Sequence, residues 1–121
     1  MSRAVDGSKR KDHRKKILKL AKGYWGRRHS NYKTAKDAVT KSLSYAYRDR
    51  KDRKGDFRRI WIIRINAACR TEGIAYSRLI NGLNKAGINI NRKVLASLAI
   101  DDNGAFKEIV AQAKAALGMG A

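Results

Sequence analysis

Cationic and aromatic side chains are interleaved in one segment of this chain, residues 45–59, which reads YAYRDRKDRKGDFRR. Arginine or lysine occupies about every second position, and Tyr45 and Tyr47 stand beside them. Guanidinium and ammonium groups bind phosphate oxygens. Tyrosine rings stack on unpaired bases, which RNA offers in loops and junctions more often than duplex DNA does. These residue types therefore indicate binding to a nucleic acid, and the rings favour RNA.

The distribution of charge supports a polyanionic partner. The 121 residues carry a formal net charge of +19. Residues 1–55 hold 19 Lys and Arg against 5 Asp, a charge of +14, whereas residues 56–121 hold 10 against 5 acids, a charge of +5. Asp49 and Asp52 are too few to neutralise the cations around them. The positive charge must therefore be balanced by a partner, and contacts to phosphate would fix position rather than read sequence.

The predicted binding residues fall into three groups. Phosphate contacts are expected from cations of the basic segments, namely Lys15, Lys16, Lys19, Lys22, Arg27, Arg28, Arg48, Arg50, Arg53, Lys54, Arg58 and Arg59. Stacking or wedging on bases is expected from Tyr24, Trp25 and Tyr47; for Tyr45 and Tyr47, rings that join helices to one another are an equal alternative. A second patch is expected from polar residues of the later segment, namely Arg64, Asn66, Arg70, Arg78, Arg92 and Lys93.

Helices must position these groups, since the chain has no proline and no extended alternation typical of strands. Residues 9–22 are expected to form a first helix with an inward face of Ile17, Leu18, Leu20 and Ala21. Gly23 and Gly26 should end or bend it. A long helix should run from about Asn31 to Glu72, with a kink or a break at Gly55.

The later segment predicts a small helical bundle. Three short helices are expected, with start or stop signals at Ser77, Gly87, Asn91, Asp101 or Asp102, and Gly118. Their core should include side chains of the preceding long helix, namely Phe57, Ile60, Trp61, Ile65 and Ala68. The predicted fold is therefore all-α, with a basic helical extension over residues 1–55 and a globular helical domain over residues 56–121.

Other classes of function receive little support. Cys69 is the only cysteine and is expected to be a small core residue rather than a nucleophile. His13 and His29 have no ligand at zinc spacing, and no phosphate-cradling glycine loop is present. We therefore expect no enzyme activity, no metal and no cofactor. No apolar run is long enough to span a membrane, and Asp6 and Asp12 count against a mitochondrial presequence.

Four stretches resemble the bacterial-type large-subunit ribosomal protein L-twenty family: KKILKLAKGYWGRR (15–28), YAYRDRKDRKGDFRRIWIIRINAACR (45–70), YSRLINGLNKAGI (76–88) and NRKVLASLA (91–99). The resemblance implies a primary binder of large-subunit ribosomal RNA, needed early in assembly and with no part in peptide-bond chemistry. It also implies a basic helical arm that enters the RNA and a small domain on an RNA helix junction. Some members of the family bind their own messenger RNA and repress its translation.

The chain departs from the family in two places. The segment SRAVDGSKRKDH introduces acids where the family has a basic run, and Gly55 replaces a basic residue or another helix former. The expected partners are large-subunit ribosomal RNA, neighbouring large-subunit proteins and the chain's own messenger RNA. The expected location is the cytoplasmic ribosome of a bacterium, with an organelle ribosome as an alternative. The alternative function is compaction of nucleic acid by a histone-like protein.

Overall fold

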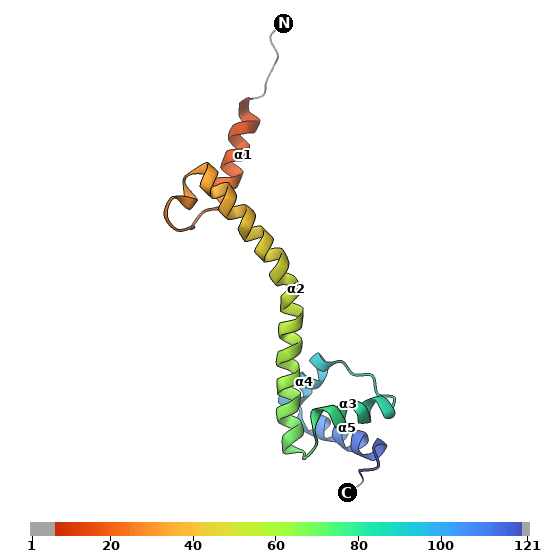
Figure 1. The fold of residues 1–121 in the computed structure, drawn as a ribbon. Helices are drawn as coiled ribbons and strands as arrows, with labels where there is room; N and C mark the ends of the chain where they lie inside the picture. Colours follow the sequence, from red (N-terminus) through yellow and green to blue (C-terminus); the bar gives the residue numbers. More distant parts are fainter. Residues whose placement is uncertain (1–6, 120–121) are drawn as a thin grey trace. The chain divides into compact units, whose positions relative to one another are not determined.

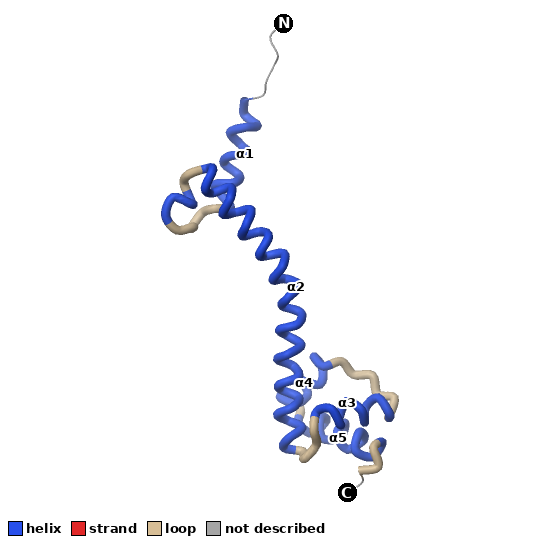
Figure 2. Tube along the Cα trace, viewed as in Figure 1, coloured by secondary structure: helices blue, strands red, loops and turns tan. Residues whose placement is uncertain are grey.

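The structure is a computed structural model that describes residues 7–119. Its elements are α1 (Gly7–Leu20), η1 (Gly26–His29), α2 (Tyr32–Thr71), α3 (Tyr76–Lys85), α4 (Arg92–Asp101) and α5 (Asn103–Ala116) (Figure 1). The described residues contain helices, turns and loops but no strand (Figure 2). This confirms the predicted all-α class, with a long helix followed by three short ones. Asp6, one of the two acids by which the chain departs from the family, lies outside the described residues.

The long helix α2 remains helical through Gly55, so the predicted alternative of two separate helices is wrong. A Cβ added at Gly55 would meet no atom within 4 Å, so neither crowding nor backbone conformation requires glycine there. A glycine inside a helix costs about 1 kcal/mol relative to alanine. The remaining residues of this 40-residue helix evidently offset that cost.

Contacts between residues divide the chain into two compact units. Unit 1 comprises residues up to Lys51, and unit 2 begins at Asp52, so the division falls within α2. The functional partition at residue 55, between an RNA-penetrating extension and a globular RNA-binding domain, stays a prediction.

Unit 1 has a very small core. Among residues 7–51 the buried side chains are Ala21, Ala35 and Val39, against which Ile17, Leu18 and Tyr24 pack. Positive φ angles of 89° at Gly23 and 63° at Gly26 let the chain turn between α1 and η1. Leu20 was predicted to face inward but is half exposed, because the helix ends there and Ala21 takes the inward position.

Unit 2 has a larger core, to which every helix of the unit contributes. Its most buried large side chains include Ile65 of α2, Leu79 of α3, Leu95 of α4 and both Phe106 and Val110 of α5. Trp61 and Ala68 pack partly against this cluster, as predicted. Cys69 is fully buried, which confirms it as a core residue. Burial raises the pKa of the Cys69 thiol to about 11, so the thiol is neutral near pH 7.

The prediction that Phe57 and Ile60 lie in the core is wrong, since Phe57 is 46% exposed and Ile60 is 43% exposed. Ile63, on the same side of α2 as Ile60, is also exposed. This part of α2 carries apolar residues on nearly all sides, so the spacing alone cannot say which side faces the bundle. Packing selects the side of Ile65 and Cys69.

Most of the start and stop signals predicted for the short helices are confirmed. The side-chain oxygen of Asn91 accepts a hydrogen bond from Val94 N–H at 2.9 Å, and that of Asp102 accepts one from Ala105 N–H at 3.0 Å. Gly87 and Gly118 follow α3 and α5 with φ angles of 71° and 70°. The predicted start at Ser77 is wrong, because α3 begins at Tyr76 and Ala75 occupies its N-cap position.

Helices α3 and α5 approach each other so closely that one position between them admits only glycine. A Cβ placed on Gly82 would lie 2.5 Å from the carbonyl oxygen of Ala113 and 2.9 Å from its Cβ. Backbone would have to move to accept it. Gly82 therefore fixes the distance between the two helices that form most of the contacts within the bundle.

Candidate nucleic-acid interface

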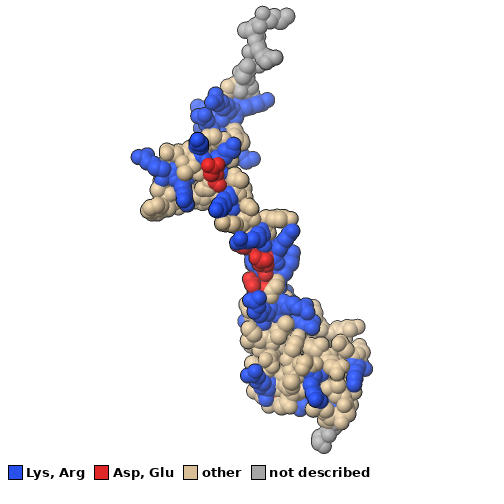
Figure 3. Space-filling view, viewed as in Figure 1, with Lys and Arg blue, Asp and Glu red and all other residues tan. Residues whose placement is uncertain are grey.

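Exposed cations dominate unit 1. Residues 7–51 contain 16 Lys and Arg against Asp12, Asp37 and Asp49, a formal charge of +13. Helix α1 has no buried residue, and its cations Lys15, Lys16 and Lys19 are exposed. Lys and Arg side chains gather over α1, η1 and the middle of α2 on the face drawn in Figure 3. So much like charge on so small a core opposes compaction.

Local ion pairs neutralise little of this charge. In unit 1, Arg48 Nε lies 2.8 Å from an Asp49 carboxylate oxygen. Further along α2, within unit 2, a terminal nitrogen of Arg59 lies 3.8 Å from an Asp56 carboxylate oxygen. Both pairs are largely exposed, and such pairs contribute at most about 1 kcal/mol. They hold two cations near α2 without reducing the excess of positive charge along it. The predicted phosphate-binding residues of α1, η1 and α2 are all exposed at the surface.

Two tyrosines in the middle of α2, Tyr45 and Tyr47, are covered by cations of the same helix. The guanidinium of Arg48 lies 4.6 Å from the ring centre of Tyr45, and the ammonium of Lys51 lies 4.3 Å from that of Tyr47. Lys41 also approaches Tyr45, at 5.6 Å. Both rings remain exposed, at 45% for Tyr45 and 60% for Tyr47. One or two cations therefore lie close to each exposed ring. A base that stacks on such a ring would have its phosphate near a cation.

Trp25 and Tyr24 have different environments, although they are neighbours in sequence. Trp25 is 89% exposed, so its indole contributes nothing to the core of unit 1. Tyr24 packs partly against Ala21, Ala35 and Val39. The geometry leaves Trp25 available for stacking and gives Tyr24 a packing role.

A hollow of about 280 Å³ lies on the surface of unit 1, bounded by Tyr24, Arg28 and the side of α2 that carries Ala38, Lys41 and Tyr45. Its lining combines the small residues Ala38 and Ser42 of α2 with two cations and two tyrosine rings. Lys41 was absent from the predicted binding residues, and the prediction for Tyr45 was left open between stacking on RNA and joining helices. Their spacing of four residues on one helix, cation then ring, was the signal that would have found them.

Unit 2 does not bring all of its predicted contact residues together. Arg64 and Asn66 are two positions apart on α2, so their side chains point to nearly opposite sides of the helix. Arg64 is exposed and Asn66 is partly buried. A single RNA groove lying against one side of α2 could meet only one of them.

Specific contacts orient two other predicted cations of unit 2. Arg92 Nε donates a hydrogen bond to the hydroxyl of Tyr76 at 2.8 Å, which joins the starts of α3 and α4. Arg78 contacts the sulfur of Met119 at 3.9 Å. Arg70 and Lys93 are exposed. Sequence reasoning missed the role of Tyr76, because no local pattern indicates a hydroxyl partner sixteen residues away.

Residues 7–119 contain neither a cluster of metal ligands nor a membrane-spanning helix. No group of three or more His, Cys, Asp or Glu side chains could hold a metal ion within this range. The Nδ1 of His29 lies 2.9 Å from the carbonyl oxygen of Tyr24, a local contact across the loop. None of the helices described is both long and apolar enough to cross a bilayer.

Comparison with known proteins places these features in one family. The profile of the family described as "Ribosomal protein L20" matches residues 3–109. A protein of Treponema pallidum is 56% identical over 121 residues, which cover 100% of this chain and 99% of the relative. A protein of Gluconobacter oxydans is 58% identical over 118 residues, 98% of this chain and 100% of the relative. Both are named "Large ribosomal subunit protein bL20".

Proposed function

The chain belongs to the ribosomal protein L20 family, and on that premise we propose that it binds large-subunit ribosomal RNA directly through unit 1 and through cations of unit 2. The observation that carries this proposal is the combination in unit 1 of a charge of +13 with only three buried side chains among residues 7–51. Such a unit gains more from a surrounding polyanion than from its own core.

The binding mechanism is neutralisation of phosphate together with insertion of rings. Lysine and arginine displace counterions from the RNA, and the release of those counterions drives association. The cations of α1, η1 and α2 form the phosphate contacts. Trp25 and Tyr47 are the stacking residues, because both rings are exposed and Tyr47 carries Lys51 beside it.

The role in the ribosome is structural. The relatives are named as proteins of the large ribosomal subunit. The chain binds RNA early in assembly, next to other large-subunit proteins, in a bacterial ribosome or one of bacterial type in an organelle. Binding to its own messenger RNA would use the same surfaces.

Direct binding can be tested with deproteinised RNA and no other ribosomal protein present. The purified chain should bind large-subunit ribosomal RNA at least about tenfold more tightly than small-subunit ribosomal RNA, measured by filter binding at one salt concentration. A primary binder needs no helper protein. Equal affinity for the two RNAs would contradict recognition of the large subunit, and binding that required a second protein would contradict the direct role.

A further inference from the structure

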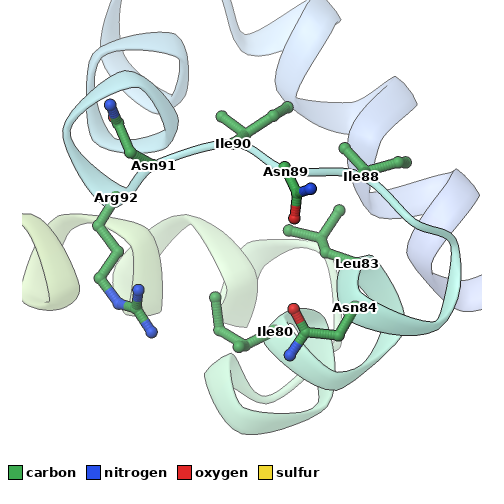
Figure 4. Close-up of a pocket in the computed structure, with 8 residues that line it drawn as sticks. All are labelled: Ile80, Leu83, Asn84, Ile88, Asn89, Ile90, Asn91 and Arg92. Atoms are coloured by element: carbon green, nitrogen blue, oxygen red, sulfur yellow. The ribbon is translucent and has the colours of Figure 1, made fainter.

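Unit 2 contains a hollow that is unlike the cationic surfaces described above. It measures about 390 Å³ and lies between α3, the loop at residues 88–91 and the start of α4 (Figure 4). Its apolar lining includes Ile80, Leu83 and Ile88. The volume is at the lower end of the range for pockets that bind small molecules, so it suits a ligand no larger than one nucleotide.

Neutral amides rather than cations supply most of the polar groups around this hollow. The Oδ1 atom of Asn91 is engaged in capping α4. Asn84 and Asn89 are exposed, and within residues 7–119 their side chains make no hydrogen bond to the protein. Figure 4 shows both amides at the edge of the hollow, from α3 and from the loop. An asparagine amide offers one acceptor and two donors, the arrangement that pairs with the edge of a base.

One cation, Arg92, also lines the hollow. The guanidinium of Arg92 is held by the hydrogen bond of its Nε to Tyr76, and no acid of residues 7–119 forms an ion pair with it. Its terminal nitrogens therefore remain able to bind an anion. No acidic residue lines the hollow. The polar groups thus match a phosphate on one side and a neutral, hydrogen-bonding ring on the other.

We propose that this hollow holds one unpaired nucleotide of the RNA, with its base against the isoleucine and leucine side chains, its edge bonded to Asn84 and Asn89, and its phosphate on Arg92. This inference rests on the proposed RNA-binding function and adds a base-reading site to it. Base edges are accessible in RNA loops and junctions, where bases are unstacked and turned outward. Unit 1 then positions the chain on phosphates, while the hollow of unit 2 supplies selectivity for sequence.

The test compares the full chain with a double variant, Asn84→Ala with Asn89→Ala. Asn103→Ala is the matched control, since it removes an exposed amide of α5 that does not line the hollow. We expect the double variant to bind large-subunit ribosomal RNA about tenfold more weakly, with an unchanged dependence on salt because no phosphate contact is lost. Chemical probing of base edges should show one unpaired nucleotide that the original chain protects and the double variant leaves reactive. The control should match the original chain.

Three outcomes would overturn the inference. The first is a double variant with unchanged affinity and unchanged base protection. The second is a loss of affinity accompanied by a weaker salt dependence, which would indicate a phosphate contact. The third is normal binding to RNA alone but poor incorporation when other large-subunit proteins are present, which would indicate a protein in the hollow. If the original chain itself failed to bind the RNA, the proposed function would fail instead. Circular dichroism of the variants establishes that each is folded.

Discussion

Raising the potassium chloride concentration from about 50 to about 200 mM should weaken binding of the chain to large-subunit ribosomal RNA by about 10³- to 10⁵-fold. This range corresponds to six to ten phosphate contacts, roughly what the exposed cations of α1, η1 and α2 can supply. Released counterions provide the free energy of such contacts, and added salt removes that gain. Equilibrium titrations at several salt concentrations measure the slope of the logarithm of the affinity against the logarithm of the salt concentration.

A pair of variants connects the slope to particular residues. Lys54→Ala removes an exposed cation of α2 and should lower the slope by about 0.7 to 0.9, the value for one phosphate contact. Lys107→Ala removes a cation that lies 3.8 Å from Glu72 in unit 2 and has no predicted RNA contact, so it should leave the slope unchanged. A slope near zero for the original chain would show that phosphate neutralisation does not drive binding.

Replacing Phe106 by alanine should destabilise unit 2 by about 3–5 kcal/mol. Phe106 is fully buried, and its ring lies in the cluster that all helices of the unit share. Removing it leaves a cavity that the neighbouring side chains cannot fill. In a unit of this size the loss corresponds to a decrease in melting temperature of about 15 °C or more.

Phe57→Ala is the matched control, since it makes the same change in the same unit at a side chain that is 46% exposed. It should change the melting temperature by only a few degrees. Fluorescence of Trp61 can follow unfolding of unit 2, because Trp61 packs against its core whereas Trp25 is already exposed in unit 1. Equal effects of the two substitutions would mean that the core of unit 2 is not centred on Phe106.

The helices and their ends were predictable because each depends on local chemistry. Asn91 and Asp102 cap α4 and α5 through backbone groups three residues away, and Gly87 and Gly118 adopt the left-handed conformation that glycine favours. Such signals lie within a few residues of one another. They require no knowledge of how the helices pack.

The choice of buried side was not predictable, because it depends on distant partners. Phe57 and Ile60 have the same apolar character as Ile65, yet α3, α4 and α5 pack only on the side of Ile65. The hollow beside Asn84 and Asn89 likewise brings α3 together with a loop that follows it. The cationic surface was predictable from composition, whereas this hollow required the fold.

Competition between nucleic acids tests most directly whether the chain is an RNA-binding protein of the ribosome. A complex of the full chain with labelled large-subunit ribosomal RNA is challenged with duplex DNA at equal nucleotide concentration and constant salt. Recognition of folded RNA through exposed rings, cations and a base-sized hollow predicts that most of the complex persists. Displacement of half or more of the RNA by the DNA would contradict it and would favour a histone-like protein that neutralises any nucleic acid.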